Sequence, residues 1–225
     1  MQPERTAFPG IFRLWLGKRG LMVTRNLVPG ASVYGEQLIR TDSGECRAWD
    51  PKRSKLAAAV LNGLNQLGLQ EGALVLYLGA STGTTVSHVS DIVGPKGIVF
   101  AVESAPRVCR ELVFLAEQRQ NVHPILADAN HPERYADRVL GADFLYQDIA
   151  QRAQVEIFLK NVRQFLKPGG FCVLCVKARS IDVTKRPQQL FREVRAALER
   201  ELIVADVRDL APFQADHAFF VCKRR

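Results

Sequence analysis

From residue 73 onward, short apolar runs alternate with helix-like stretches. The apolar runs, each of strand length, span residues 73–78, 98–102, 124–126, 142–146 and 171–176. The helix-like stretches span residues 84–92, 106–119, 133–139, 155–166 and 187–201. Strands that alternate with helices of this length predict a parallel sheet covered by helices on both faces. Two last runs, 202–207 and 218–222, have no helix between them and predict an antiparallel pair at one edge of this sheet.

The first fifty residues have a different pattern. Short apolar runs at 11–16, 21–23 and 37–39 are separated by glycines, a proline and a turn-like segment at 41–44, which is typical of small β structure. After Pro51 helix formers dominate, which predicts a helix over residues 54–67 that ends at Gly68. We therefore predict a small N-terminal β domain, residues 1–50, followed by an α/β domain, residues 51–225.

The composition indicates a globular protein with a basic surface. Hydrophobic residues make up 47% and charged residues 24% of the chain, which excludes disordered, collagenous and low-complexity classes. The net charge is +8, and residues 1–55 hold ten Lys and Arg against five Asp and Glu. This balance favours a polyanionic partner such as nucleic acid, although it is also compatible with a basic surface that serves only solubility.

Nothing in the sequence indicates a membrane segment or a secretion signal. No run approaches the roughly 18 consecutive apolar residues of a membrane helix, and the first residues lack the layout of a signal peptide. The five cysteines are an odd number without the spacing of a metal site. Cys172 and Cys175 form a C-x-x-C pair, but odd spacing on a strand points them to opposite faces. We therefore expect free thiols, no metal and a cytoplasmic location.

The first strand of the α/β region leads into a glycine-containing turn before a helix. This segment reads YLGASTGTT over residues 77–85, and ligands of an open α/β sheet bind at this edge, where the backbone can approach them closely. A dinucleotide fingerprint would have glycine in place of Ser81, which weakens the interpretation as a nicotinamide-dependent oxidoreductase. Small residues in such a turn also serve packing, so the turn by itself leaves a cofactor site undecided.

Acidic residues follow the next three strands at the same edge. Glu103 ends the second strand about 20 residues after the turn, the spacing at which a carboxylate accepts hydrogen bonds from ribose hydroxyls. Asp128 and Ala129 follow the third strand, and Asp148 follows the fourth, with Gln151 shortly after it. That edge faces solvent or ligand, so packing does not explain three carboxylates there. A cofactor that contains a nucleoside becomes the favoured interpretation.

Two lysines are placed to lie near Asp148, and one loop histidine follows an aspartate. Lys177 ends the strand over 171–176, and Lys55 begins the helix that precedes the first strand. Both are also compatible with solvated strand and helix ends, where single lysines usually lie. His217, which follows Asp216, is compatible with a site residue or with a surface pair. The other histidines, His88, His123 and His131, are assigned no role.

Four stretches of the sequence resemble a known family closely. They span residues 48–59 (AWDPKRSKLAAA), 75–95 (VLYLGASTGTTVSHVSDIVGP), 176–184 (VKARSIDVT) and 216–218 (DHA). In their order and length they look like fibrillarin, and the similarity runs from about residue 33 to the end. The resemblance implies a Rossmann-like class I methyltransferase sheet, mostly parallel with an antiparallel C-terminal edge strand. It also implies an S-adenosylmethionine-dependent RNA 2′-O-ribose methyltransferase of the archaeal type, which lacks a glycine- and arginine-rich N-terminal tail.

The resemblance also assigns roles to residues. The cofactor would contact Tyr77, Gly79, Ala80, Thr84, Thr85, Glu103, Asp128, Ala129, Asp148 and Gln151. The catalytic set proposed for the family matches Lys55, Asp148, Lys177 and His217. A ribose hydroxyl is a poor nucleophile until it loses or shares its proton. Two neighbouring ammonium groups lower each other's pKa, and a carboxylate between them opposes that shift while holding the geometry. On this hypothesis Lys177 is the base, Lys55 orients the hydroxyl or phosphate, Asp148 aligns lysine and methyl donor, and His217 supports them.

Members of this family usually work inside a box C/D guide complex. The resemblance implies four partners: a guide RNA, the target RNA that pairs with it, a Nop-domain scaffold protein and a kink-turn RNA-binding protein. The implied targets are ribosomal RNA and, as a further class, transfer RNA. Two alternatives are a guide-independent RNA or protein (glutamine) methyltransferase and a non-catalytic subunit of an RNA–protein complex. The intact Lys55, Asp148, Lys177 and His217 argue against the non-catalytic subunit.

Overall fold

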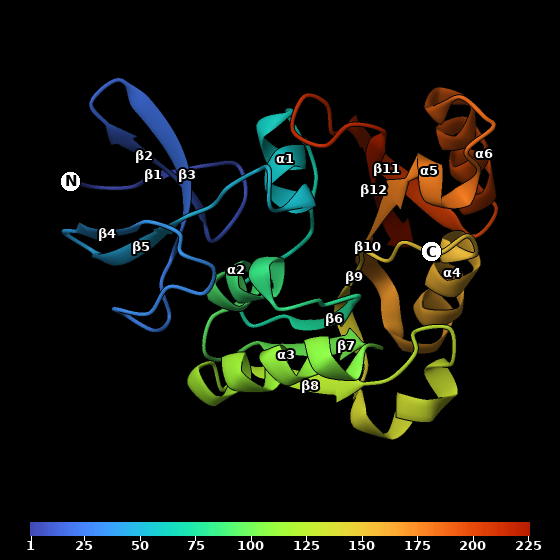
Figure 1. The fold of residues 1–225 in the computed structure, drawn as a ribbon, viewed down its shortest axis with the longest axis horizontal. Coiled ribbons are helices and arrows are strands. Elements are labelled where there is room, and N and C mark those ends of the chain that lie inside the picture. The colour runs from blue at the N-terminus through green and yellow to red at the C-terminus, as the bar shows by residue number, and fades with distance from the viewer.

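The computed structural model describes residues 1–225, which form two β-sheets (Figure 1). The smaller sheet lies at the N-terminal end, is antiparallel and has the strand order β1-β2-β3-β5-β4. Its strands are β1 (Glu4–Arg5), β2 (Ile11–Leu16), β3 (Arg19–Arg25), β4 (Leu38–Thr41) and β5 (Gly44–Ala48). The three apolar runs predicted here overlap β2, β3 and β4. Hydrophobic pattern did not predict β5, because its sequence GECRA buries an arginine, Arg47, in place of an apolar residue.

The larger sheet has seven strands in the order β11-β12-β10-β9-β6-β7-β8. The strands are β6 (Leu74–Leu78), β7 (Ile98–Glu103), β8 (Val122–Leu126), β9 (Ala142–Gln147), β10 (Leu166–Lys177), β11 (Leu202–Asp209) and β12 (His217–Arg224). β6 to β10 run parallel, and β12 is antiparallel to both of its neighbours, β10 and β11. The predicted parallel sheet with an antiparallel pair at one edge is confirmed.

Helices cover both faces of this sheet (Figure 1). On one face lie α1 (Lys55–Leu61), α2 (Thr84–Val93) and α3 (Pro106–Gln118), and on the other α4 (Gln154–Phe165), α6 (Pro187–Glu199) and the 3-10 helix η1 (Pro132–Arg138). The short α5 (Ala178–Ile181) follows β10 directly. The alternation along β6 explains the two layers, because Val75 and Tyr77 pack in one core and Leu76 and Leu78 in the other.

The two cysteines of the C-x-x-C pair point to opposite faces of β10, as predicted. Cys175 lies in the core beneath α1 and α2, and Cys172 lies in the core beneath α4 and α6. All five cysteines are buried and free. The pair therefore serves packing on two separate layers.

Two predicted helices differ in the structure. The helix expected to end at Gly68 ends at Leu61, because Gly63 adopts a left-handed backbone (φ +80°) and the N–H groups of Gly63 and Leu64 donate to the carbonyls of Val60 and Ala59. The side chain of Asn62 then donates hydrogen bonds to the backbone oxygens of Asp209 and Ala211, each at 2.8 Å. The helix expected over residues 133–139 is the 3-10 helix η1, which is interrupted by the non-helical backbone of Tyr135 (φ −134°, ψ 17°). Both differences come from local or tertiary contacts that periodicity does not report.

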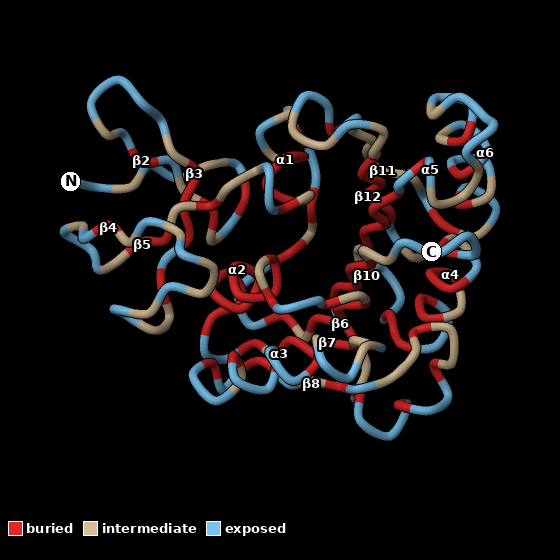
Figure 2. Tube along the Cα trace, in the orientation of Figure 1, coloured by how far each residue is buried: buried red, intermediate tan, exposed pale blue.

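The N-terminal sheet packs against the larger one and shares its core. Phe8, Ile11, Met22 and Trp49 belong to the same cluster of buried side chains as the buried residues of α2. Figure 2 shows buried positions running through α2 and the central strands of the large sheet. The segment between β5 and α1, which contains the predicted boundary at residue 50, is therefore part of a continuous structure.

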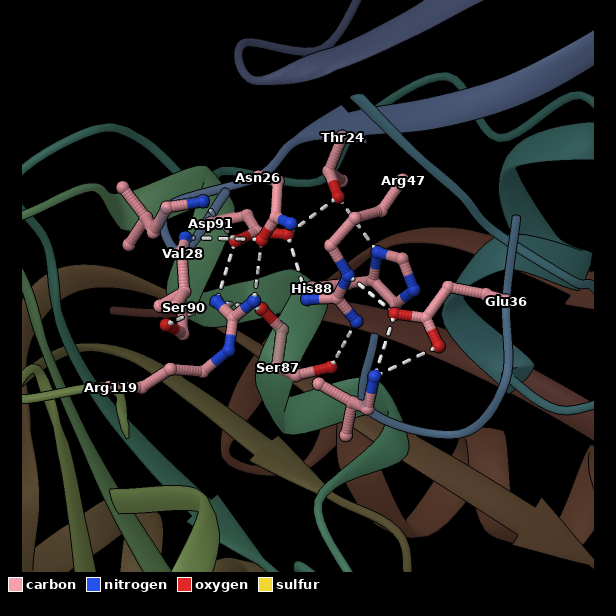
Figure 3. Close-up of polar contacts among 12 residues, drawn as sticks. Thr24, Asn26, Val28, Glu36, Arg47, Ser87, His88, Ser90, Asp91 and Arg119 are labelled. Carbon is pink, nitrogen blue, oxygen red and sulfur yellow. Dashed lines mark hydrogen bonds and ion pairs between the residues drawn. The ribbon is translucent and has the colours of Figure 1, made fainter. Parts of the chain in front are cut away.

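A buried polar network joins the N-terminal sheet to α2 (Figure 3). Asp91 of α2 accepts hydrogen bonds from Thr24 (2.8 Å), Arg47 (3.0 Å) and Arg119 (2.6 Å), and all four side chains are almost completely buried. His88, which sequence reasoning left without a role, is buried between the hydroxyls of Thr24 and Tyr34, each 2.8 Å from a ring nitrogen. Burial, followed by the charges of the two arginines, holds the pKa of His88 well below its ordinary value, so it is neutral.

Candidate functional site

A cavity of about 210 Å³ lies where the strands β6, β7, β8 and β9 end. Its lining includes six of the residues that the sequence predicted as cofactor ligands: Gly79, Glu103, Asp128, Ala129, Asp148 and Gln151. Tyr77 and Ala80 lie buried outside this lining, and Thr84 and Thr85 form the first turn of α2. The carboxyl ends of parallel strands thus bring acidic groups from three strands to one cavity.

The turn after β6 approaches its neighbours too closely for side chains. Gly79 has a left-handed backbone (φ +78°), and a Cβ added to it would collide with the backbone oxygen of Asp148. Ser81 also has a positive φ (52°), and its backbone N–H donates to Glu103 Oε2 at 2.9 Å. The turn therefore presents backbone to the cavity on one side and is held by the carboxylate of β7 on the other.

Glu103 is fixed by backbone donors from two segments. Its Oε2 accepts from Ser81 N and its Oε1 accepts from Ala105 N, both at 2.9 Å. An ionised carboxylate has about four lone-pair sites, so two remain for ligand hydroxyls. The side chain is thus held in one orientation at the cavity wall and can still accept hydrogen bonds.

Lys55 and Asp148 form an ion pair at the cavity. Lys55 Nζ donates to both carboxylate oxygens of Asp148, at 2.8 and 2.7 Å, and the two side chains are 20% and 25% exposed. Burial by itself lowers the pKa of Lys55, but the charge and hydrogen bond of Asp148 outweigh this effect and raise it above the ordinary value. The opposing effect of the carboxylate therefore dominates at Lys55, which stays a cation.

Lys177 and His217 lie directly opposite each other on β10 and β12. His217 Nδ1 donates to the backbone oxygen of Ala215 at 2.6 Å, which leaves Nε2 as the acceptor of the neutral ring. Burial has the largest effect on His217 and lowers its pKa below the ordinary value. The hydrogen bond to Ala215 and the charge of Asp148 raise this pKa, whereas the charges of Lys55 and Lys177 lower it further. The structure thus brings the four predicted catalytic residues into one electrostatic group.

One residue of the site was not found by sequence reasoning. Ser54, at the N-cap of α1, accepts a hydrogen bond from Ala57 N at 3.4 Å and another from Thr85 Oγ1 at 3.0 Å. A serine directly before a run of helix formers is a recognisable N-cap signal. Its second bond, to a residue 31 positions away, has no signal in the sequence.

No group of three or more His, Cys, Asp or Glu side chains is arranged to hold a metal ion. None of the helices has the length and apolar character required to cross a bilayer.

The fibrillarin family model matches residues 2–225 of the sequence. The chain belongs to the fibrillarin family. The match starts near the first residue, so the expectation that similarity begins at about residue 33 was wrong. The N-terminal sheet is therefore part of the fibrillarin pattern.

Fibrillarin relatives match over the whole length of the chain. The fibrillarin-like rRNA/tRNA 2′-O-methyltransferase of Thermococcus onnurineus is 47% identical over 100% of both chains. The structure of Aeropyrum pernix fibrillarin with natively bound S-adenosyl-L-methionine matches with a TM-score of 0.91, 44% identity and coverage of 99% of this chain and 98% of that one. A fibrillarin chain from a fibrillarin/Nop5p complex matches with a TM-score of 0.87, 39% identity and coverage of 98% and 100%.

Proposed function

We propose that this member of the fibrillarin family is an S-adenosylmethionine-dependent RNA 2′-O-ribose methyltransferase that acts on ribosomal RNA and, as a further class, transfer RNA. The observation that carries the proposal is the Lys55–Asp148 ion pair at the cavity, with Lys177 and His217 beside it. The names of whole-length relatives support the same reaction and the same RNA classes. The nicotinamide alternative has no comparable support.

The cavity fits S-adenosylmethionine by the chemistry of its lining. Gly79 lets the backbone approach the ligand, Glu103 offers acceptors for ribose hydroxyls, and Asp128 with Ala129 borders the place of an adenine. Asp148 and Gln151 border the methionine end, with Thr84 and Thr85 at the start of α2. Tyr77 and Ala80, which the resemblance also assigns to the cofactor, are buried and lie outside the lining of the cavity. When bound, the cofactor supplies an activated methyl group on a sulfonium.

Lys55 and Asp148 act as an orienting pair. Because Asp148 keeps Lys55 charged, Lys55 does not accept a proton from the target; it attracts the hydroxyl oxygen or a neighbouring phosphate. Asp148 holds Lys55 in place with both oxygens and also lines the cofactor cavity. This shared residue links the position of the target ribose to that of the methyl donor.

Lys177 acts as the proton acceptor, with His217 in support. Both residues stand at the end of the β10–β12 ladder, where cross-strand side chains are neighbours. His217 presents its unprotonated Nε2 when neutral, so it can accept a hydrogen bond from an ammonium or hydroxyl group nearby. Turnover by Lys177→Ala close to that of the parent protein, with cofactor affinity intact, would refute this role for Lys177.

The protein works with partners in a box C/D guide complex. A Nop-domain scaffold protein is supported by the fibrillarin/Nop5p complex of a relative that is 39% identical. A kink-turn RNA-binding protein and a guide RNA that pairs with the target complete the proposed assembly. The five free thiols fit the cytoplasmic location that we propose for it. The net charge of +8 suits an RNA partner.

Methyl transfer from labelled S-adenosylmethionine tests this function. The protein would be assayed alone and then together with scaffold protein, kink-turn protein, guide RNA and target RNA, with the modified ribose mapped by its resistance to alkali. We expect transfer only in the complete mixture, at the ribose that the guide specifies. Transfer by the protein alone to unguided RNA would support the guide-independent alternative, and no transfer despite tight cofactor binding would support a non-catalytic role.

A further inference from the structure

The hydroxyl of Ser54 lies where two parts of the site meet. On one side it caps α1, whose first residue is Lys55. On the other it accepts a hydrogen bond of 3.0 Å from Thr85, in the first turn of the helix that follows the glycine turn. Ser54 is 1% exposed and Thr85 is 9% exposed. Water therefore has little access to this bond, and loss of the Ser54 hydroxyl leaves the buried Thr85 hydroxyl without this acceptor.

The contact closes a ring of elements around the methyl-donor site. Lys55 reaches Asp148 through its ammonium group, and Asp148 packs against Gly79 through its backbone. The glycine turn then leads into α2 at Thr84, and Thr85 returns to Ser54, the residue before Lys55. Every link but the last joins residues already assigned to the cofactor or to catalysis. The Ser54–Thr85 bond is the hydrogen bond that joins the start of α1 directly to the start of α2, and their apolar side chains share one core.

Helix capping alone does not account for this arrangement. The bond from Ala57 N to Ser54 Oγ is 3.4 Å long, and it satisfies the end of α1 without any help from α2. The hydroxyl of Thr85 sits on another helix and adds nothing to that cap. The Ser54–Thr85 bond instead holds the N-terminal ends of α1 and α2 at a fixed separation.

We propose that Ser54 is a positioning residue that couples the cofactor turn to Lys55. This role rests on the proposed methyltransferase function. Through the Ser54–Thr85 bond, an ordered cofactor turn keeps the Lys55–Asp148 pair aligned with the methyl donor. Displacement of a reacting group by about 1 Å is enough to reduce a rate on the order of 100-fold. We expect loss of the Ser54–Thr85 bond to reduce kcat by about 10-fold and to leave the affinity for target RNA unchanged.

The test is a double-mutant cycle in the complete guide complex. The variants are Ser54→Ala, Thr85→Val and the combination of both, with kcat, KM for target RNA and the cofactor dissociation constant measured for each. Each single change is expected to reduce kcat about 10-fold, and the double variant is expected to be no slower than the slower single variant. Thr85→Ser, which restores a hydroxyl, is expected to recover most of the loss caused by Thr85→Val.

Two controls separate coupling from a general structural effect. Ser54→Gly removes the hydroxyl at little cost to the cap, so it should lose as much activity as Ser54→Ala while α1 remains stable. Ser43→Ala, at an exposed serine, should leave kcat unchanged. Multiplicative effects of the two changes, or a parental kcat in Ser54→Gly, would overturn the coupling. Failure of the methyltransferase proposal itself is recognised separately, because the parental protein would then be inactive in the same assembly.

Discussion

At the scale of single residues, the site depends on charges that are held in fixed states. Asp148 keeps Lys55 protonated, and the Ala215 carbonyl selects the tautomer of His217. A protonated His217 would lose its acceptor at Nε2 and would place another cation beside Lys55. The neutral ring is therefore the form that the site requires.

The rate of methyl transfer should accordingly fall as the pH is lowered through the pKa of His217. Burial, together with Lys55 and Lys177, places this pKa below 6.5, against the opposing effects of Ala215 and Asp148. We expect one inflection of the kcat profile to lie below pH 6.5 and to disappear in His217→Asn, which cannot titrate there. The measurement is a pH–rate profile at saturating cofactor. An unchanged inflection in His217→Asn would assign it to another group.

At the scale of elements, the glycines before and after β6 provide a matched pair of substitutions. Gly79 and Gly72 have the same backbone angle (φ +78°), but a Cβ at Gly79 meets Asp148 whereas a Cβ at Gly72 meets nothing within 4 Å. Gly79→Ala should weaken cofactor binding by more than about 10-fold, since either the turn or Asp148 must move. Gly72→Ala should cost about 1–2 kcal/mol of stability and leave cofactor affinity intact. Titration calorimetry and urea unfolding of both variants would measure this, and equal cofactor affinities would contradict it.

The contact of α2 with the N-terminal sheet depends on one carboxylate. Asp91→Asn would leave Arg119 buried without a counter-charge and Arg47 with only Glu36. We expect the free energy of unfolding to fall by about 3–5 kcal/mol, the usual effect of breaking a buried ion pair. Glu199→Gln, which breaks the exposed pair with Arg195, should change it by less than about 1 kcal/mol. Urea unfolding would compare the two, and similar losses would show that burial of the network contributes little.

At the scale of the whole molecule, the two predicted domains share one hydrophobic core. The core beneath α2 includes Phe8, Ile11 and Met22, and the polar network crosses the same boundary. We expect a single calorimetric unfolding transition, with a van't Hoff enthalpy equal to the calorimetric one. A fragment of residues 51–225 would expose this core face and unfold at a lower temperature. Two separate transitions would instead support independent domains.

Much of the fold and of the candidate site could be read from the sequence. The β and α alternation predicted the parallel sheet, and acidic residues at three strand ends predicted one cavity, because parallel strands place their carboxyl ends at one edge. The missed features are of another kind. Strand β5 carries a buried Arg47, which pairs with the distant Asp91, and α1 ends early at Gly63, whose backbone is left-handed. A distant partner decides the first case, and a local glycine turn that helix propensity does not report decides the second.

The sequence by itself determined which side chains stand at the strand ends, since strand order along the chain and a two-residue period decide this locally. Tertiary structure alone decided which distant residues meet: Ser54 with Thr85, Asp91 with Arg47, and His88 with Tyr34. These contacts join residues 31 to 54 positions apart, and their hydrogen bonds exist only once helices and sheets have packed. The physical reason is that periodicity reports the face on which a residue lies, whereas a partner is set by how two faces dock.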